Sequence, residues 1–142
     1  MNLRLRFIAL SLTAFFAVLI LVTPQASAGP ILSGTYKITE NTDLGAQVRI
    51  TVQLNLVNGG TTGLTVTKVG LRSLSAPGQR VSVTSTVVVH SHSSAQVSLQ
   101  FLMAKQDFDR WSTGPHQQFF VSLRPSGGKT TLVNIPLLRI QE

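Results

Sequence analysis

The chain has 142 residues, with twelve Lys and Arg against five Asp and Glu and no cysteine. The absence of cysteine excludes disulfide frameworks, thiol catalysis and Cys-ligated metal sites. One domain of this length buries a core without covalent crosslinks. The cations are spread singly along the chain, and this pattern does not indicate a specific nucleic-acid surface.

The first 28 residues have the three regions of a signal peptide. Arg4 and Arg6 precede a nearly continuous apolar run over 7–22, and Ala26-Ser27-Ala28 has the small residues of a cleavage site. A spanning helix needs a longer run, of about 20 residues. We therefore predict cleavage before Gly29 and export to the periplasm, the cell surface or the medium, with an uncleaved membrane anchor as the alternative. Cleavage lowers the formal net charge of +7 by two, to +5, and leaves no further membrane contact.

The stretch 46–58 is the clearest strand signal in the chain. Apolar residues such as Ile50, Val52 and Leu54 alternate with polar residues such as Thr51 and Gln53. A period of two gives a strand one apolar face and one solvated face. A single strand cannot cover its own apolar face, so the pattern requires a second sheet packed against it.

Six further strand-like runs surround this one, over 35–40, 64–74, 81–90, 95–103, 117–124 and 130–140. A change of phase near Lys68 predicts a β-bulge or a bend between sheets. Pro136 favours an edge or a bulge in the last run. The segment 104–116 has no period of two and is interpreted as a long connection, and no helix is expected after the signal peptide.

These runs predict one domain over 29–142, an all-β, seven-stranded antiparallel Greek-key sandwich. A small closed barrel is the alternative, because strand periodicity does not determine whether a sheet closes.

The region from Gly29 onward resembles an immunoglobulin-like domain of exported bacterial proteins, including the CARDB-type group. The resemblance depends on three features of the sequence. They are the strand 48–52 leading to Asn58-Gly59, the spacing of the seven runs, and Asp-Phe-Asp-Arg-Trp over 107–111 before the penultimate run. Antibody-type cysteines and their core Trp are absent, since Trp111 lies in a connection. The resemblance implies the sandwich fold and an adhesive or spacer role, without a particular ligand.

His90 and His92 form the sharpest candidate for chemistry. Residues two apart on a strand point to the same side, so both imidazoles could bind one metal, with His116 or an acidic residue as third ligand. The alternative is a pair of solvated histidines at a hairpin end. No cofactor is expected.

Asp107 and Asp109 allow two interpretations. Alternate carboxylates in a loop can converge on Ca²⁺, but this ion needs six to eight oxygens. We favour the alternative, in which one Asp caps a helical turn that packs Phe108 and Trp111 on the sandwich edge. Trp111 is otherwise a candidate contact residue on which a glycan could stack, although a lone Trp more often closes the end of a core.

An exposed patch is predicted from Phe120 and Leu102, which lie on the outward parity of their runs. Because no Gly-x-Ser-x-Gly elbow or catalytic His motif occurs, no enzyme is expected. The sequence favours a binding or structural module that contacts an envelope or surface protein or self-associates. A small-ligand or metal carrier using His90 and His92 is the alternative.

Overall fold

The structure, a computed structural model, describes residues 31–140 apart from 77, 79 and 114–117. The predicted signal peptide lies outside these residues. The described part contains eight strands and one helix, and the strands form two sheets of four. Within this part, no helix has the length and apolar character that crossing a bilayer requires.

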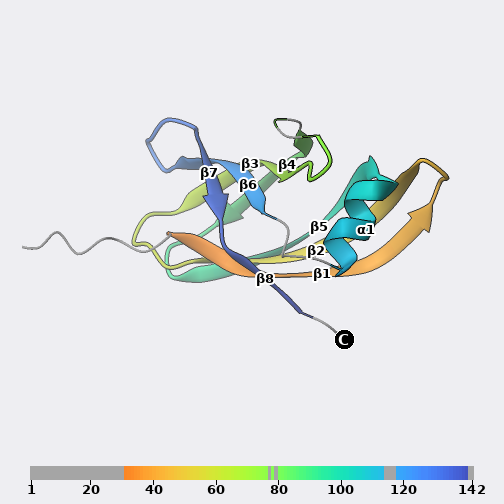
Figure 1. The fold of residues 1–142 in the computed structure, drawn as a ribbon. Coiled ribbons are helices and arrows are strands. Elements are labelled where there is room, and N and C mark those ends of the chain that lie inside the picture. The colour runs from red at the N-terminus through yellow and green to blue at the C-terminus, as the bar shows by residue number, and fades with distance from the viewer. Residues whose placement is uncertain (1–30, 77, 79, 114–117, 141–142) are drawn as a thin grey trace, which may run out of the picture.

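The two sheets face each other as separate layers (Figure 1). The first has the order β5-β2-β1-β8 and is made of β1 (Leu32–Asp43), β2 (Gln47–Asn58), β5 (Ser93–Ala104) and β8 (Leu137–Arg139). The second has the order β4-β3-β6-β7 and is made of β3 (Leu64–Arg72), β4 (Arg80–Val89), β6 (Phe119–Pro125) and β7 (Thr131–Ile135). The prediction of an all-β sandwich is therefore confirmed.

β2 lies at the centre of the core, as its alternation predicts. Ile50, Val52 and Leu54 are fully buried between the sheets, whereas Arg49 on the other face is exposed. The second sheet contributes Val66, Val69 and Val121 from β3 and β6. Burial of a side chain of this size stabilises a fold by about 1.5–3 kcal/mol, which explains why this face determines the register.

The predicted bulge near Lys68 is present in β3. The register of β3 against both neighbours shifts between Val66 and Lys68, so Thr67 lies outside the regular pairing. Its hydroxyl donates to the carbonyl of Ser122 at 3.2 Å. The extra residue changes the parity of β3 and allows Val66 and Val69 to share the core face.

The last predicted strand is divided at Pro136, which corrects the expected seven antiparallel strands to eight in the described residues. Ile135 pairs with Phe119 in the second sheet, while Leu137 pairs with Gly34 in the first. Proline lacks the N–H that a ladder needs, so the strand leaves one sheet at this residue and joins the other. β8 is parallel to β1, so the sheet is mixed.

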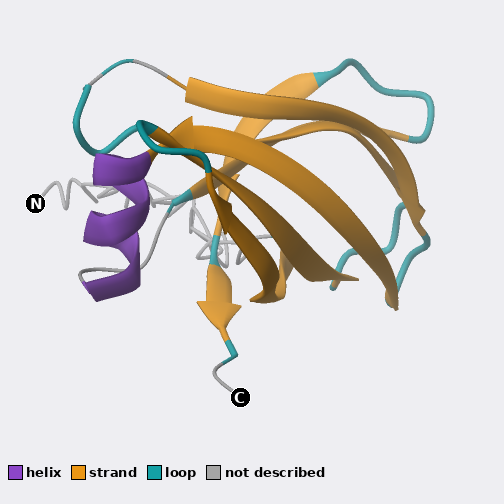
Figure 2. Ribbon diagram, turned by 90° about the vertical axis from the view of Figure 1, so that its right-hand side faces the viewer, coloured by secondary structure: helices purple, strands orange, loops and turns teal. Residues whose placement is uncertain are grey.

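The segment expected to be a loop forms α1 (Lys105–Thr113), a second correction. The helix lies to the side of the strands (Figure 2) and brings the Trp111 ring against Tyr36 and Phe119. Nine residues give too few turns for helical periodicity to stand out in the sequence. The interpretation of Trp111 as a residue that closes the end of the core is confirmed, since it is 2% exposed.

Candidate functional site

The free edges of the two sheets are the first candidates for a binding site, because an edge offers unpaired backbone donors and acceptors. The sheet orders place β5 and β8 at the edges of one sheet and β4 and β7 at the edges of the other. β7 has five residues and is followed by Pro136, and β8 has three residues and contains Arg139. Short length, proline and charge are the usual devices that protect an edge from pairing.

Two further edge segments are also protected. In β4 the register places Ser85 and Thr86 opposite the single Thr67 of β3, which is a bulge. The part of β1 that β8 leaves uncovered has a register shift after Ile38 and carries the charged residues Glu40 and Asp43. A bulge twists an edge away from a straight partner, and charged side chains along an edge oppose pairing.

β5 lacks every one of these devices. Its twelve residues pair with β2 from Ser93 to Ala104 without a register shift. The strand contains no charged residue and no proline. Leu99, Phe101 and Met103 are buried on its inner side, and its outer side is exposed at Ser94, Gln96, Ser98, Gln100, Leu102 and Ala104. Among the edges of the described residues, β5 is therefore the one best suited to accept another strand.

Both ends of β5 are held in place by backbone hydrogen bonds. The N–H of His92 donates to the carbonyl of Gly60 at 3.2 Å, and the N–H of Lys105 donates to the carbonyl of Ala46 at 3.0 Å. The Lys105 ammonium also forms an ion pair with Asp43. An edge fixed at both ends loses little conformational freedom when a strand is added, which favours binding.

Asn58 organises the connection that precedes β5, a role that sequence reasoning missed. This fully buried side chain donates to the carbonyls of Thr62, Val89 and His90, at 2.8, 3.2 and 3.2 Å. Its carbonyl oxygen accepts the N–H of Gly60 at 2.9 Å. The sequence pattern indicated only a turn at this Asn, because its distant partners are apparent only after the sheets pack.

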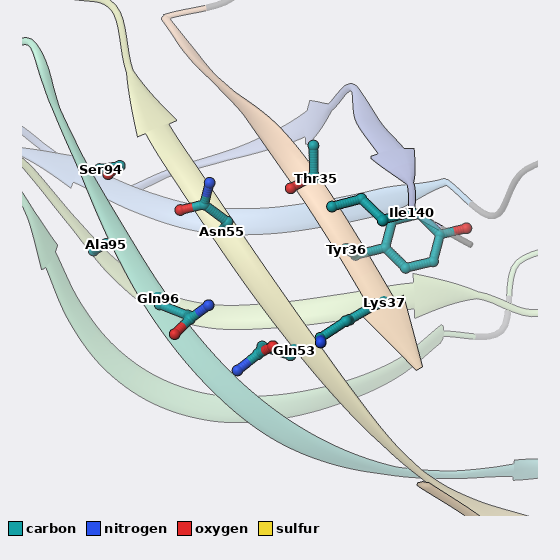
Figure 3. A pocket seen from close by; sticks show the side chains of 9 residues that line it. All are labelled: Thr35, Tyr36, Lys37, Gln53, Asn55, Ser94, Ala95, Gln96 and Ile140. Atoms are coloured by element: carbon teal, nitrogen blue, oxygen red, sulfur yellow. The ribbon is translucent and has the colours of Figure 1, made fainter. Parts of the chain in front are cut away.

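A shallow groove of about 590 Å³ crosses the outer face of the first sheet beside β5 (Figure 3). Gln53 and Asn55 from β2 and Gln96 from β5 project into it, next to Thr35 and Lys37 from β1. The three amides make no hydrogen bond within the described part of the chain. They can both donate to and accept from a ligand.

The predicted histidine pair lies in the turn between β4 and β5, not on a strand. His90 follows the last residue of β4, and His92 has a positive φ of 49°. Side chains two apart in a turn do not share a direction as they do on a strand, so the strand geometry assumed for a common metal is not present at these two residues. His116 lies outside the described residues, and the residues that the structure describes contain no group of three metal-binding side chains.

The predicted contact residues do not form one patch. Leu102 is 45% exposed on the outer side of the first sheet, but Phe120 belongs to the second sheet and is 4% exposed. Phe120 covers Gly70, its cross-strand partner, and the Arg80 guanidinium lies 5.0 Å from its ring centroid. Trp111 is buried as well. Outward parity correctly predicted the side of the sheet on which Phe120 lies. The ring is nevertheless buried, because Gly70 has no side chain and the ring packs directly on its backbone.

Asp107 and Asp109 do not converge as a calcium pair would. The carboxylate of Asp107 accepts the N–H groups of Leu74 and Ser75, at 3.1 and 2.6 Å, and the hydroxyl of Ser73 at 2.7 Å. It therefore holds the loop after β3 against α1 and does not cap its own helix. Burial raises the pKa of Asp107, but the hydrogen bonds outweigh burial, so the net pKa lies below the ordinary value of 3.8.

No protein-family model matches the sequence, and no curated protein shows significant similarity to it. Among solved structures, the chain is similar to the structural-genomics target SoR45, at 9% identity and a TM-score of 0.45 over 73% of this chain and 80% of that one. It is similar to a protein from Archaeoglobus fulgidus at 12% identity and a TM-score of 0.39, over 70% and 90% of the two chains. A beta-glucuronidase of glycoside hydrolase family 2 has 10% identity and a TM-score of 0.42, over 73% of this chain and 11% of the enzyme.

Proposed function

We propose that this chain is an exported, non-catalytic binding module that makes protein–protein contacts in the cell envelope by accepting a strand at the edge of β5. The observation that carries the proposal is the contrast between β5 and the other edges. β5 is long, regular and uncharged, while the edges at β4, β7, β8 and the uncovered part of β1 are bulged, short or charged. Strand addition derives affinity from main-chain hydrogen bonds and specificity from alternate side chains.

An immunoglobulin-like assignment is part of this proposal, and the order of the strands supports it. In seven-stranded immunoglobulin-type sandwiches, the first two strands are neighbours in one sheet, and the third, sixth and seventh strands share the other. Here β1 and β2 are neighbours, and β3, β6 and β7 follow one another in the second sheet. Modules of this architecture present exposed strand edges at the flanks of the sandwich.

The experiment places a photo-reactive residue on β5 in the expressing cell. Ser98 is exposed at the middle of β5, and we replace it with p-benzoylphenylalanine. An added strand brings its Cβ atoms to within about 5.5 Å of this position, so illumination is expected to give a covalent protein adduct. Ser82, exposed on the bulged strand β4, is the matched control. An adduct at Ser82 but none at Ser98 would contradict the proposal.

A second candidate function is the binding of a small, neutral polar ligand in the groove beside β5. Gln53, Asn55 and Gln96 line the groove with amide groups that have no partner within the described residues. Amides pair with hydroxyl groups as both donors and acceptors, so a sugar is the ligand class that fits. In this form of the small-ligand carrier hypothesis, the ligand binds to the outer face of the first sheet and not to His90 and His92.

Titration of the ¹⁵N-labelled protein with a neutral disaccharide such as cellobiose tests this second function. Shifts of the side-chain amide signals of Gln53 and Asn55 are expected, and the Gln53 shift should vanish in the Asn55→Ala variant. Gln100→Ala, on β5 but outside the groove lining, is the control and should keep them. Shifts confined to residues outside the groove would contradict it.

A further inference from the structure

We propose that the strand added at β5 comes from a second copy of this chain, with the two β5 strands antiparallel about a two-fold axis. The inference rests on the proposed strand-accepting function and names its occupant. The first four-stranded sheet would then continue across the axis into the same sheet of the second copy. Such an interface is isologous, because each copy uses the same surface.

The absence of charge along β5 carries the proposal. A two-fold axis sets β5 against itself, so a charged side chain close to the axis would have a like charge near it on the same strand of the other copy. Like charges opposite each other destabilise a strand pair. The chain as a whole has a net charge of +7, yet no charged residue occurs from Ser93 to Ala104. The edge that a symmetric pairing needs is thus free of repulsion between charged side chains, although the chain as a whole is basic.

The apolar side of the same edge is incompletely covered within one copy. Ala95 and Val97 on β5 are only half-buried. Val83 and Val87, on the inner side of the neighbouring edge strand β4, are half-buried as well. β4 and β5 contact each other across the two sheets. A second β5 strand would set apolar residues of its own inner side opposite Ala95 and Val97, which removes further apolar surface from water.

The pleat of the strands restricts the register of the pair. Residues directly opposite each other in an antiparallel pair lie on the same side of the sheet. The axis must therefore pass beside a residue, and the middle of β5 offers Ser98 or Leu99. With the axis at Ser98, Gln96 of each copy lies opposite Gln100 of the other. With the axis at Leu99, these two positions are diagonal neighbours, so in both registers they are close.

Charge substitution at these two positions tests the proposal. Gln96 and Gln100 are exposed, so their replacement leaves the core intact. We expect the wild-type chain to be a dimer by light scattering coupled to gel filtration. The variant Gln96→Lys/Gln100→Lys and the variant Gln96→Glu/Gln100→Glu should each dimerise at least about tenfold more weakly, because each sets like charges together. An equimolar mixture of the two variants should restore a dimer that contains one copy of each.

The control carries the same two charges on the edge at the other flank of the sandwich. Leu132→Lys/Asn134→Lys on β7 adds two lysines at exposed positions two residues apart and should leave the dimer unchanged. If the wild-type chain is monomeric at about 100 μM, or if a β5 lysine variant still dimerises, the strand added at β5 does not come from a second copy. This concentration detects any dimer tighter than a weak encounter.

The photo-crosslink at Ser98 distinguishes self-pairing of β5 from strand addition by another protein. An adduct of twice the chain mass supports the second copy. An adduct with a different protein, together with a monomeric wild type, overturns self-pairing but leaves the strand-accepting function in place. No adduct at Ser98 and a monomeric chain overturn both.

Discussion

The indole Nε1 of Trp111 donates a hydrogen bond to the hydroxyl of Tyr36 at 3.0 Å, although the two residues lie 75 positions apart. Both side chains are buried, and their rings stack with centroids 5.7 Å apart. The bond connects α1 to β1 and fixes the helix over the end of the first sheet. α1 continues directly from β5, so this contact also holds the C-terminal end of the proposed binding edge.

Replacement of Tyr36 by Phe is expected to lower the free energy of unfolding by about 1–3 kcal/mol, because the buried indole N–H loses this acceptor. A urea titration followed by circular dichroism measures the change, because the sequence contains a single Trp and the cycle below replaces it. Trp111→Phe and the double variant complete a mutant cycle, which should show coupling between the two residues. If Tyr36→Phe unfolds at the same urea concentration as the wild type, the bond contributes nothing to stability.

The hydrogen bonds that Asp107 accepts from the loop after β3 predict a loss of stability in acid. Since the pKa of Asp107 is lower in the folded state than its ordinary 3.8, the unfolded state binds more protons as the pH falls. Its contribution is present above about pH 3.8 and is lost as the pH falls through the lower folded pKa. Melting temperatures measured from pH 6 to pH 2 should therefore fall in this range, and less steeply in Asp107→Asn.

The pKa of Asp43 is also lowered, by the hydrogen bond from Lys105, but this side chain is exposed at the surface. Asp43→Asn is thus the control for the acid transition. If the melting temperature depends equally less on pH in Asp43→Asn and Asp107→Asn, the loss of stability in acid does not come from the hydrogen bonds of Asp107.

Gly70 is required because the ring of Phe120 lies over its backbone. A Cβ atom at this position would overlap three carbons of the ring. Gly70→Ala should therefore displace Phe120 and cost about 1–3 kcal/mol, as overpacking does. Gly59→Ala meets no atom closer than 3.9 Å and is the matched control. Denaturant midpoints compare the two, and similar midpoints would show that Phe120 moves without cost.

The register of β2 predicts unequal effects of neighbouring substitutions. Val52→Ala removes buried methyl groups and should cost about 1–3 kcal/mol. Thr51 is only half-buried, and its hydroxyl donates to Glu40 at 3.1 Å on the outer face. Thr51→Ala should cost much less, because water replaces this exposed partner. Equal losses in a denaturant titration would mean that a neighbour also covers the outer face.

Export is predicted from the first 28 residues. Intact mass spectrometry of the chain recovered from outside the cytoplasm should give a protein that begins at Gly29. A full-length chain in the membrane fraction would instead support the uncleaved anchor.

Local patterns in the sequence were sufficient to predict the strands, the central role of β2 and the bulge near Lys68. Each depends on a period of two or on its interruption, and both are properties of neighbouring residues. The sandwich followed for the same reason, because strands with one apolar face must pack against another sheet. Pro136 predicted the irregularity of the last strand, since a missing N–H is a property of one residue.

Only the tertiary structure decided which residues are accessible. Phe120 has outward parity but is covered, because Gly70 lies opposite it on another strand. His90 and His92 lie in a turn, and the distance between their side chains depends on that turn and not on strand geometry. The lack of charge in β5 was visible in the sequence, but it became significant only when the order of the sheet placed β5 at an edge. Edges are created by pairing between distant segments, and the periodicity of one segment carries no information about its neighbours.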